Sequence, residues 1–257
     1  MRFAILASGS AGNALLIETS ESRILVDCGL SAKQLNRRLD ALGAAGEKLD
    51  AVLLSHEHDD HVAGARTVAR QHQAPIYASY GTGWALRSQW PDTAIETLQQ
   101  GSTKSFGAIS VEPIIVPHDA REPYMFVFSA GSSRLGLLTD VGMPTEHIQQ
   151  RFKELDSLIL EFNHDASMLE ASVYPRSLKN RIGGPYGHLS NDQARQILAS
   201  LDATNLSSIT AAHLSEKNND PKLVEDLLAQ YSPAGCRNFV AEQHSSSDWV
   251  DVQSNRN

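Results

Sequence analysis

The feature that most constrains the fold is a run of six residues that can bind metal, which reads His-Glu-His-Asp-Asp-His from His56 to His61. It directly follows a short apolar run at 51–54 that suits a buried strand. After it, apolar residues recur at helical spacing up to Ala69. The chain therefore has to turn from strand to helix inside a segment that carries three imidazoles and three carboxylates.

The spacing of these residues predicts two coordination spheres. His56 and His58 project to the same side if the chain is extended there, so they can share one ion. Asp60 and His61 then lie in the first turn of the helix and point toward a second ion about 3.5–4 Å away. Imidazole nitrogens favour Zn²⁺ or another transition ion over Mg²⁺ or Ca²⁺, with Mn²⁺ and Fe left open. The alternative is a solvated surface loop, which six such residues in succession argue against.

Strands and helices alternate along the whole chain, with no internal repeat and no low-complexity linker. Helices are predicted at 31–42, at 60–69, at 145–154, at 191–201 and at 221–231, with Ser31, Asp60 and Asp220 as N-caps. Strands are predicted at 2–6, 14–18, 23–26, 51–54, 75–78, 109–116, 124–130, 134–139 and 157–161, with one more short strand after the last helix. The chain is therefore expected to form one α/β domain over 1–257, with 245–257 as a frayed tail.

Composition limits the cellular setting and the partners. No apolar run approaches the ~20 residues that span a bilayer, and the N-terminus lacks the apolar region of a signal peptide. Cys28 and Cys236 lie in apolar surroundings that suit reduced thiols, so a cytoplasmic protein is expected. A net charge of −8 argues against a surface-wide nucleic-acid footprint. Two divalent ions would still place about +4 at one local site.

The His-Glu-His-Asp-Asp-His run resembles the HxHxDH motif of the metallo-β-lactamase superfamily. Other elements of that superfamily follow in order. Asp27 resembles the early aspartate that supports the histidine loop, and Asp140 resembles the aspartate that bridges two ions. The resemblance implies an α/β (α+β) fold, a four-layer αββα sandwich. It also implies two divalent ions, most simply Zn²⁺, held by seven residues: His56, His58, Asp60, His61, His118, Asp140 and His213.

The same resemblance implies a hydrolase in which a metal-bound hydroxide is the nucleophile and Asp60 orients it or takes a proton. Stretches outside the core motif, such as 6–13, 161–165, 187–191 and 213–219, resemble WalJ/YycJ-type exonucleases and, more distantly, tRNase Z-type phosphodiesterases. The substrate would then be a nucleic acid, DNA or RNA. His188 would lie near the scissile phosphate and protonate the leaving oxygen.

Four cations bracket the expected site in the sequence and can hold phosphates: Arg176, Lys179, Arg181 and Lys217. Each can equally be a solvated surface charge. His188 and His164 can be structural, since His188 precedes an expected N-cap at Ser190.

Two rival functions stay open. A carbonyl hydrolase, such as a glyoxalase II-like thioesterase, a lactonase or a β-lactamase, would use the same two metals. Only 44 residues follow His213, which is short for the thioester-binding domain of glyoxalase II, and a lactamase would normally carry an export signal. A metal-binding module without activity is the non-enzymatic alternative. The native metal, the choice of DNA or RNA, the cleavage polarity and the oligomeric state are not fixed by the sequence.

Overall fold

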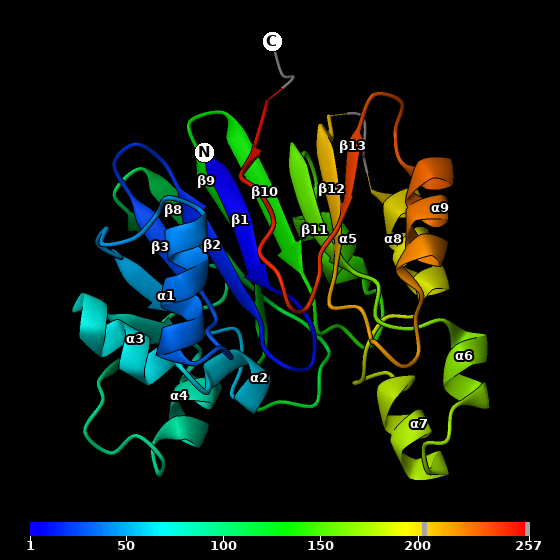
Figure 1. Cartoon of the computed structure of the whole chain (residues 1–257), viewed down its shortest axis with the longest axis horizontal. Coiled ribbons are helices and arrows are strands. Elements are labelled where there is room, and N and C mark those ends of the chain that lie inside the picture. Colours follow the sequence, from blue (N-terminus) through cyan, green and yellow to red (C-terminus); the bar gives the residue numbers. More distant parts are fainter. Residues whose placement is uncertain (202–204, 255–257) are drawn as a thin grey trace.

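Two seven-stranded sheets face each other in the computed structural model, which describes residues 1–201 and 205–254 (Figure 1). The first sheet has the order β14-β1-β2-β3-β4-β5-β6. Its strands are β1 (Arg2–Ala7), β2 (Ala14–Glu18), β3 (Arg23–Val26), β4 (Ala51–Leu53), β5 (Ile76–Ala78), β6 (Ile95–Thr97) and β14 (Val250–Asp251). Strands β3 to β6 are parallel, so their carboxyl ends lie at one edge of this sheet.

The second sheet has the order β13-β12-β11-β10-β9-β8-β7. Its strands are β7 (Lys104–Phe106), β8 (Ile109–Ile115), β9 (Tyr124–Ala130), β10 (Ser133–Leu138), β11 (Ser157–Glu161), β12 (Ser208–Ala212) and β13 (Arg237–Val240). Strands β10 to β13 are parallel, whereas β9 runs antiparallel to both β8 and β10. The carboxyl ends of β8, β10, β11 and β12 therefore lie at the same edge of the sheet.

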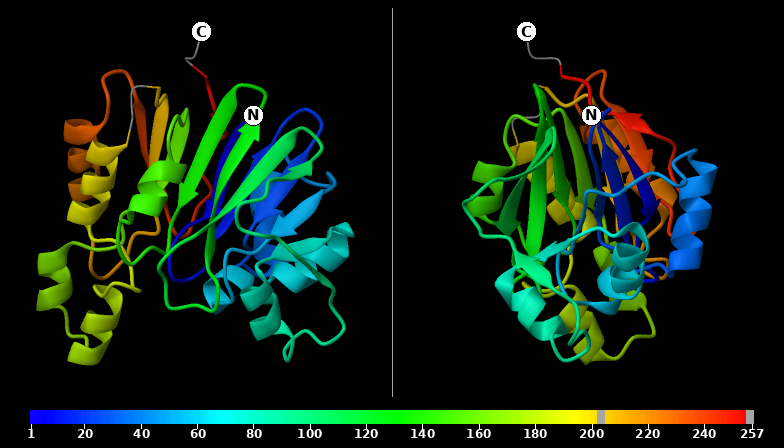
Figure 2. Two further views of the ribbon diagram at one scale, coloured as in Figure 1. Left: turned by 180° about the vertical axis from the view of Figure 1, so that it is seen from behind. Right: turned by 90° about the vertical axis from the view of Figure 1, so that its left-hand side faces the viewer.

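Helices cover the outer faces of both sheets, as the two views of Figure 2 show. The helices of the described residues are α1 (Ala32–Ala41), α2 (Asp59–Val62), α3 (Ala65–His72), α4 (Tyr80–Leu86), α5 (Glu146–Arg151), α6 (Ala166–Ala171), α7 (Arg176–Ile182), α8 (Asn191–Ser200) and α9 (Pro221–Tyr231). Helices α1 and α3 lie on the first sheet, and α5, α8 and α9 lie on the second. The αββα sandwich is confirmed. Within the described residues, no helix combines the length and the apolar character needed to span a bilayer.

Period-two alternation explains why the inner strands read as continuous apolar runs. On β2, Leu15 and Ile17 point into the core between the sheets, while Leu16 points outward beneath the helices. Both faces of the strand are buried, so its first four positions are apolar. The same alternation on β1 places Phe3 and Ile5 between the sheets and Leu6 on the outer side.

The structure corrects three details of the predicted elements. The segment predicted as a frayed tail contains β14, which pairs with β1, and Val250 and Val252 are buried; residues 255–257 lie outside the described part of the chain. The single helix predicted from Asp60 is two helices, α2 and α3, separated at Gly64. A Cβ at Gly64 would lie 1.8 Å from the carbonyl oxygen of Leu30. The two backbones therefore lie in close contact at the point where the helix is interrupted. His58, not Asp60, is the N-cap of α2.

Candidate metal centre

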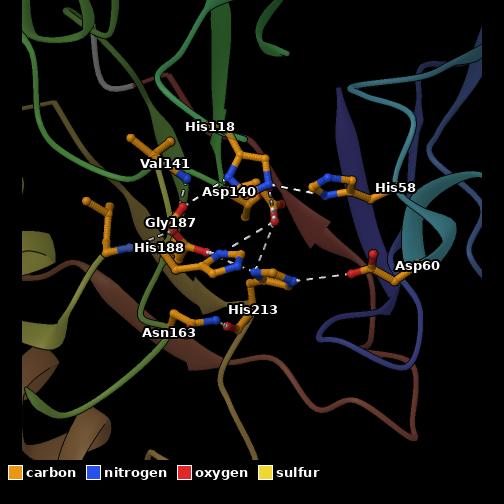
Figure 3. A network of polar contacts seen from close by, with 12 residues as sticks. His58, Asp60, His118, Asp140, Val141, Asn163, Gly187, His188 and His213 are labelled. Carbon is orange, nitrogen blue, oxygen red and sulfur yellow. Dashed lines mark hydrogen bonds and ion pairs between the residues drawn. The ribbon is translucent and has the colours of Figure 1, made fainter. Parts of the chain in front are cut away.

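The predicted ligands gather where strands of both sheets end. His56 and His58 follow β4, and Asp60 and His61 lie in α2. His118, Asp140 and His213 follow β8, β10 and β12 of the second sheet. Figure 3 shows His58 and Asp60 approaching from one side and His118, Asp140 and His213 from the other. The site is thus built between the two sheets.

Three residues of this edge adopt left-handed backbone conformations, which are uncommon outside glycine. Asp27, Asp140 and His213 have φ angles of 56°, 53° and 56°. Each lies within two residues of a strand end, so the backbone turns sharply there. Such strained positions tend to occur at functional sites. Here the turns bring three polar side chains to the gap between the sheets.

His56, His58 and His118 form the first cluster. His58 Nδ1 lies 3.0 Å from His56 Nε2 and 3.4 Å from His118 Nε2. Ligands about 2.0–2.1 Å from a tetrahedral ion lie roughly 3.4 Å from one another. The spacing of these nitrogens therefore fits one ion.

Hydrogen bonds on the far side of each ring fix the tautomers of this cluster. Ser55 Oγ donates to Asp27 at 2.7 Å, so it accepts from His56 Nδ1 at 3.0 Å. His118 Nδ1 donates to the carbonyl oxygen of Gly187 at 3.0 Å. His58 Nε2 donates to the carbonyl oxygen of Asp119 at 3.2 Å. The remaining nitrogen of each ring keeps its lone pair and faces the centre of the cluster, as second-shell partners of metal-binding histidines arrange it.

Asp60, His61 and His213 form the second cluster. Asp60 Oδ2 lies 3.5 Å from His61 Nε2 and 3.8 Å from His213 Nε2. His61 Nδ1 donates to Asp27 at 2.9 Å, and His213 Nδ1 donates to Glu161 at 2.8 Å. Both Nε2 atoms again face the cluster: His213 Nε2 has no hydrogen-bond partner, and His61 Nε2 lies 3.1 Å from the amide nitrogen of Asn13.

Asp140 lies between the two clusters. Its Oδ2 is 3.5 Å from His61 Nε2, and its Oδ1 is 3.9 Å from His118 Nε2. Among the described residues, Asp140 Oδ2 and His213 Nε2 are buried without a hydrogen-bond partner. Leaving such atoms unpaired costs about 1–3 kcal/mol each. The donor set, its spacing and these two atoms all fit bound cations, with Asp140 shared between them.

The two clusters differ in protonation. Burial lowers the pKa of His56 well below its ordinary value, and it lowers that of His118 as well. Burial also acts against protonation of His61 and His213, but Asp140 and neighbouring carboxylates outweigh it. They raise the pKa of His61 well above its ordinary value and that of His213 to about 10. His56 and His118 therefore offer neutral rings, whereas His61 and His213 hold protons until an ion displaces them.

Glu161 is a central residue that the sequence reasoning did not single out. It is fully buried at the end of β11, and its Oε1 accepts from His213 Nδ1 at 2.8 Å and from His188 Nδ1 at 2.9 Å. Its Oε2 accepts from the backbone N–H groups of Val141 and Leu189. Burial alone would raise its pKa, but His188 and His213 hold the pKa of Glu161 well below its usual range. The signal in the sequence that could have revealed Glu161 is a carboxylate directly after three apolar residues of a buried strand.

The structure separates the four predicted phosphate-binding cations. Arg181 and His188 line a cavity of about 320 Å³ beside Asp60, Asp140 and His213. Arg181 also pairs with Asp119 at 2.6 Å. The other three do not line this cavity: Arg176 pairs with Glu170, Lys179 donates to the carbonyl oxygen of Glu170, and Lys217 lies 5.7 Å from the ring of Tyr174.

Comparison with known proteins identifies the family of this chain. Residues 22–209 match the family described as the beta-lactamase superfamily domain. The chain belongs to this superfamily. The HxHxDH resemblance of the sequence is thereby confirmed at the level of the whole family.

Relatives of this superfamily member include two exodeoxyribonucleases. It is 34% identical to exodeoxyribonuclease WalJ of Streptococcus pneumoniae, with 86% of this chain and 84% of the relative covered. It is also 34% identical to exodeoxyribonuclease YycJ of Bacillus anthracis, with coverages of 90% and 88%. Ribonuclease Z of Bradyrhizobium diazoefficiens is more distant, at 24% identity over 84% of this chain and 87% of the relative.

Solved structures agree on the fold. Zn²⁺-bound PqqB from Methylobacterium extorquens superposes with a TM-score of 0.74 at 17% sequence identity, covering 96% of this chain and all of the other. At this identity the likeness concerns the architecture alone. It agrees with the two facing sheets described above.

Proposed function

We propose that this superfamily member is a dinuclear metal-dependent exonuclease that hydrolyses phosphodiester bonds in nucleic acid. The observation that carries the proposal is the pair of ligand clusters sharing Asp140, located at a cavity that also contains Arg181 and His188. The names of the two relatives that are 34% identical support the choice of a nucleic-acid substrate over a carbonyl substrate.

In this proposal two divalent ions, with Zn²⁺ as the expected metal and Mn²⁺ or Fe as alternatives, occupy the two clusters. His56, His58 and His118 would hold one ion, Asp60, His61 and His213 would hold the other, and Asp140 would serve both. When bound, the ions activate water and polarise the phosphoryl oxygen. Neutral imidazoles and carboxylates together suit transition ions.

Two side chains would move protons around the reacting phosphate. Asp60 faces the second cluster and is oriented by Asn13, whose Nδ2 donates to Asp60 Oδ2 at 3.2 Å. It is placed to orient the attacking water or to take its proton. His188 is held through Nδ1 by Glu161, which leaves Nε2 to protonate the leaving oxygen. His188 is partly exposed at the cavity, as this role requires.

Arg181 would hold a phosphate of the strand at the same cavity. Its guanidinium now pairs with the carboxylate of Asp119, and both groups are partly open to solvent. An exposed pair of this kind contributes little stability, so a phosphate oxygen can replace the carboxylate. The position of Arg181 in the cavity lining favours it over Arg176, Lys179 and Lys217.

We further propose that residues 1–257 act as one hydrolase domain in the cytoplasm. The two ligand clusters draw on both sheets, so neither half of the sandwich contains a whole site. Cys28 and Cys236 are free thiols, which suits a reducing compartment.

The test is hydrolysis of end-labelled single- and double-stranded DNA and RNA by protein loaded with Zn²⁺ or Mn²⁺. The His58→Ala variant removes one ligand of the first cluster, so cleavage should fall by orders of magnitude while the circular dichroism spectrum is kept. His147→Ala is the matched control, because His147 contacts Gln100 away from both clusters. Full cleavage by His58→Ala would overturn the ligand assignment. Hydrolysis of thioesters or lactones without cleavage of any nucleic acid would make the protein a carbonyl hydrolase instead.

A further inference from the structure

Helix α4 exposes two large aromatic side chains on one face. Tyr80 and Trp84 are four residues apart, and 69% and 51% of their surfaces are accessible to solvent. Residues at this spacing are neighbours on the helix surface. Neither ring takes part in the core, and the proposed chemistry uses neither of them.

Arginines accompany these rings. The guanidinium of Arg121 lies 4.5 Å from the centre of the Trp84 ring, and Arg87 lines the same groove as both aromatic residues. The groove has a volume of about 300 Å³, and Trp90 and Pro91 also line it. Flat rings, an open groove and exposed guanidinium groups are the components with which proteins bind unpaired nucleic-acid strands.

The carboxylates that contact α4 and Arg121 are engaged in hydrogen bonds. Glu122 Oε2 accepts from the backbone N–H of Gly81 at 2.7 Å, and its Oε1 accepts from the hydroxyl of Tyr124. Glu57 Oε1 accepts from the backbone N–H of Arg121 at 2.8 Å. Arg87 and Arg121 place two guanidinium groups on this surface, and these groups complement a phosphate backbone.

The surface is anchored to the histidine loop. Glu57 lies between His56 and His58 in the sequence, and its Oε2 accepts from the hydroxyl of Thr82 in α4 at 3.4 Å. The same carboxylate holds Arg121, three residues after His118. Figure 1 shows α4 at the same end of the sandwich as α2. A strand that ends at the ligand clusters can thus continue over α4.

We infer that Tyr80, Trp84, Arg87 and Arg121 form a stacking platform for unpaired bases of a DNA strand whose end occupies the metal centre. The inference rests on the proposed function, because it assigns the path of the substrate. Stacking uses the face of the base, so the platform accepts any sequence. Its role is to hold the strand while successive terminal nucleotides are removed.

The test compares two strands of equal length, an end-protected oligothymidylate and an abasic strand with the same phosphates. Binding to the purified protein is measured by fluorescence anisotropy. Trp84→Ala should weaken binding of the oligothymidylate roughly tenfold and leave the abasic strand unchanged, and Trp84→Phe should restore most of the loss. Tyr231→Ala is the matched control, because Tyr231 is an exposed aromatic residue of α9 with Arg195 5.2 Å from its ring. The Tyr231→Ala variant should bind both strands as tightly as the wild type does.

Hydrolysis of bis(4-nitrophenyl) phosphate, which is too small to reach α4, separates the platform from the chemistry. Wild type and Trp84→Ala should hydrolyse it equally. If no phosphodiester is cleaved but Trp84→Ala still loses binding of the base-containing strand alone, the platform stands and the proposed function fails. Equal losses on both strands, or no loss, would overturn the platform. So would a Trp84→Ala variant that changes only the oligomeric state, since the surface would then bind a second copy.

Discussion

Asp27 Oδ2 accepts a hydrogen bond from His61 Nδ1 at 2.9 Å, and both side chains are buried. The same carboxylate accepts from the backbone N–H and the hydroxyl of Ser55, which hold it in place. Asp27 thus fixes the tautomer and the orientation of His61 and turns Nε2 toward Asp60 and Asp140. The sequence prediction that Asp27 supports the histidine loop agrees with this contact.

Replacing Asp27 with Asn should weaken the binding of one ion and leave the binding of the other unchanged. Asn keeps the side-chain size and tolerates the left-handed backbone, but its amide holds the His61 ring less firmly. We expect the affinity of the ion at Asp60, His61 and His213 to fall about 10- to 100-fold, measured by competition with a chromophoric chelator. Asp50→Asn, at a carboxylate that accepts from the backbone N–H of Arg23, is the control. Two ions bound as tightly as in the wild type would contradict the assignment of Asp27.

The two ions should differ in the protons that they release. The pKa of His213 is raised to about 10, so its ring is protonated at pH 7 and must lose a proton to bind an ion. The pKa values of His56 and His118 are lowered, so those rings are already neutral. The affinity for the second ion should therefore rise with pH up to about 10, while that for the first ion depends less on pH. Calorimetric titration in buffers of different protonation enthalpy counts the protons, and equal release for both ions would refute this order.

Substitution of Arg181 and substitution of Arg176 should have different effects on DNA binding. Arg181 lines the cavity, so Arg181→Ala should raise KM for DNA and lower the slope of log affinity against log salt by about one. Arg176 pairs with Glu170 on the surface, and Arg176→Ala should change neither quantity. Steady-state cleavage over a range of salt concentrations measures both variants. Equal effects of the two substitutions would point to a diffuse charge effect in place of a phosphate contact.

Gly29 should tolerate no side chain. A Cβ at Gly29 would lie 1.9 Å from the carbonyl oxygen of Asp60, so Gly29→Ala has to displace the backbone that carries a proposed ligand. We expect a loss of about 1–3 kcal/mol in the free energy of unfolding and weaker binding of the second ion. Gly83→Ala is the control, since its Cβ would make only ordinary contact with Ile95 at 3.6 Å. Chemical denaturation and metal titration measure both variants. An unchanged affinity of Gly29→Ala for the second ion would argue against this close contact.

The resemblance of the histidine motif implied the sandwich, and the sequence predicted most of its inner strands because their apolar runs are continuous and bounded by turns. It missed β12, whose residues were read only as context for His213, and it missed α6 and α7, which are short and lack a fully apolar face. The strand β14 has two residues and exists only because β1 offers a free edge. Such elements depend on tertiary contacts that local patterns do not encode.

For the site, too, the sequence predicted some features and missed others. The seven proposed ligands come together in the structure, since each stands at a strand end or in the motif that follows one. The contacts that orient them were not visible, because Ser55, Glu161 and Gly187 reach the rings through the fold and carry no spacing signal. Charge alone could not separate Arg181 from Arg176 or Lys179, since all three belong to one short helix and differ only in the direction they face.

Each ligand cluster combines residues from both sheets, so a bound ion would work as a reversible crosslink between the two halves of the chain. Ligands that bind only the folded state stabilise it by RT ln(1 + [L]/Kd), about 4 kcal/mol at a thousandfold excess over Kd. A shortage of metal would then do more than abolish the activity. It would let the halves separate more often, expose the inner strands to proteases and shorten the lifetime of the protein, so that its abundance follows the supply of its metal.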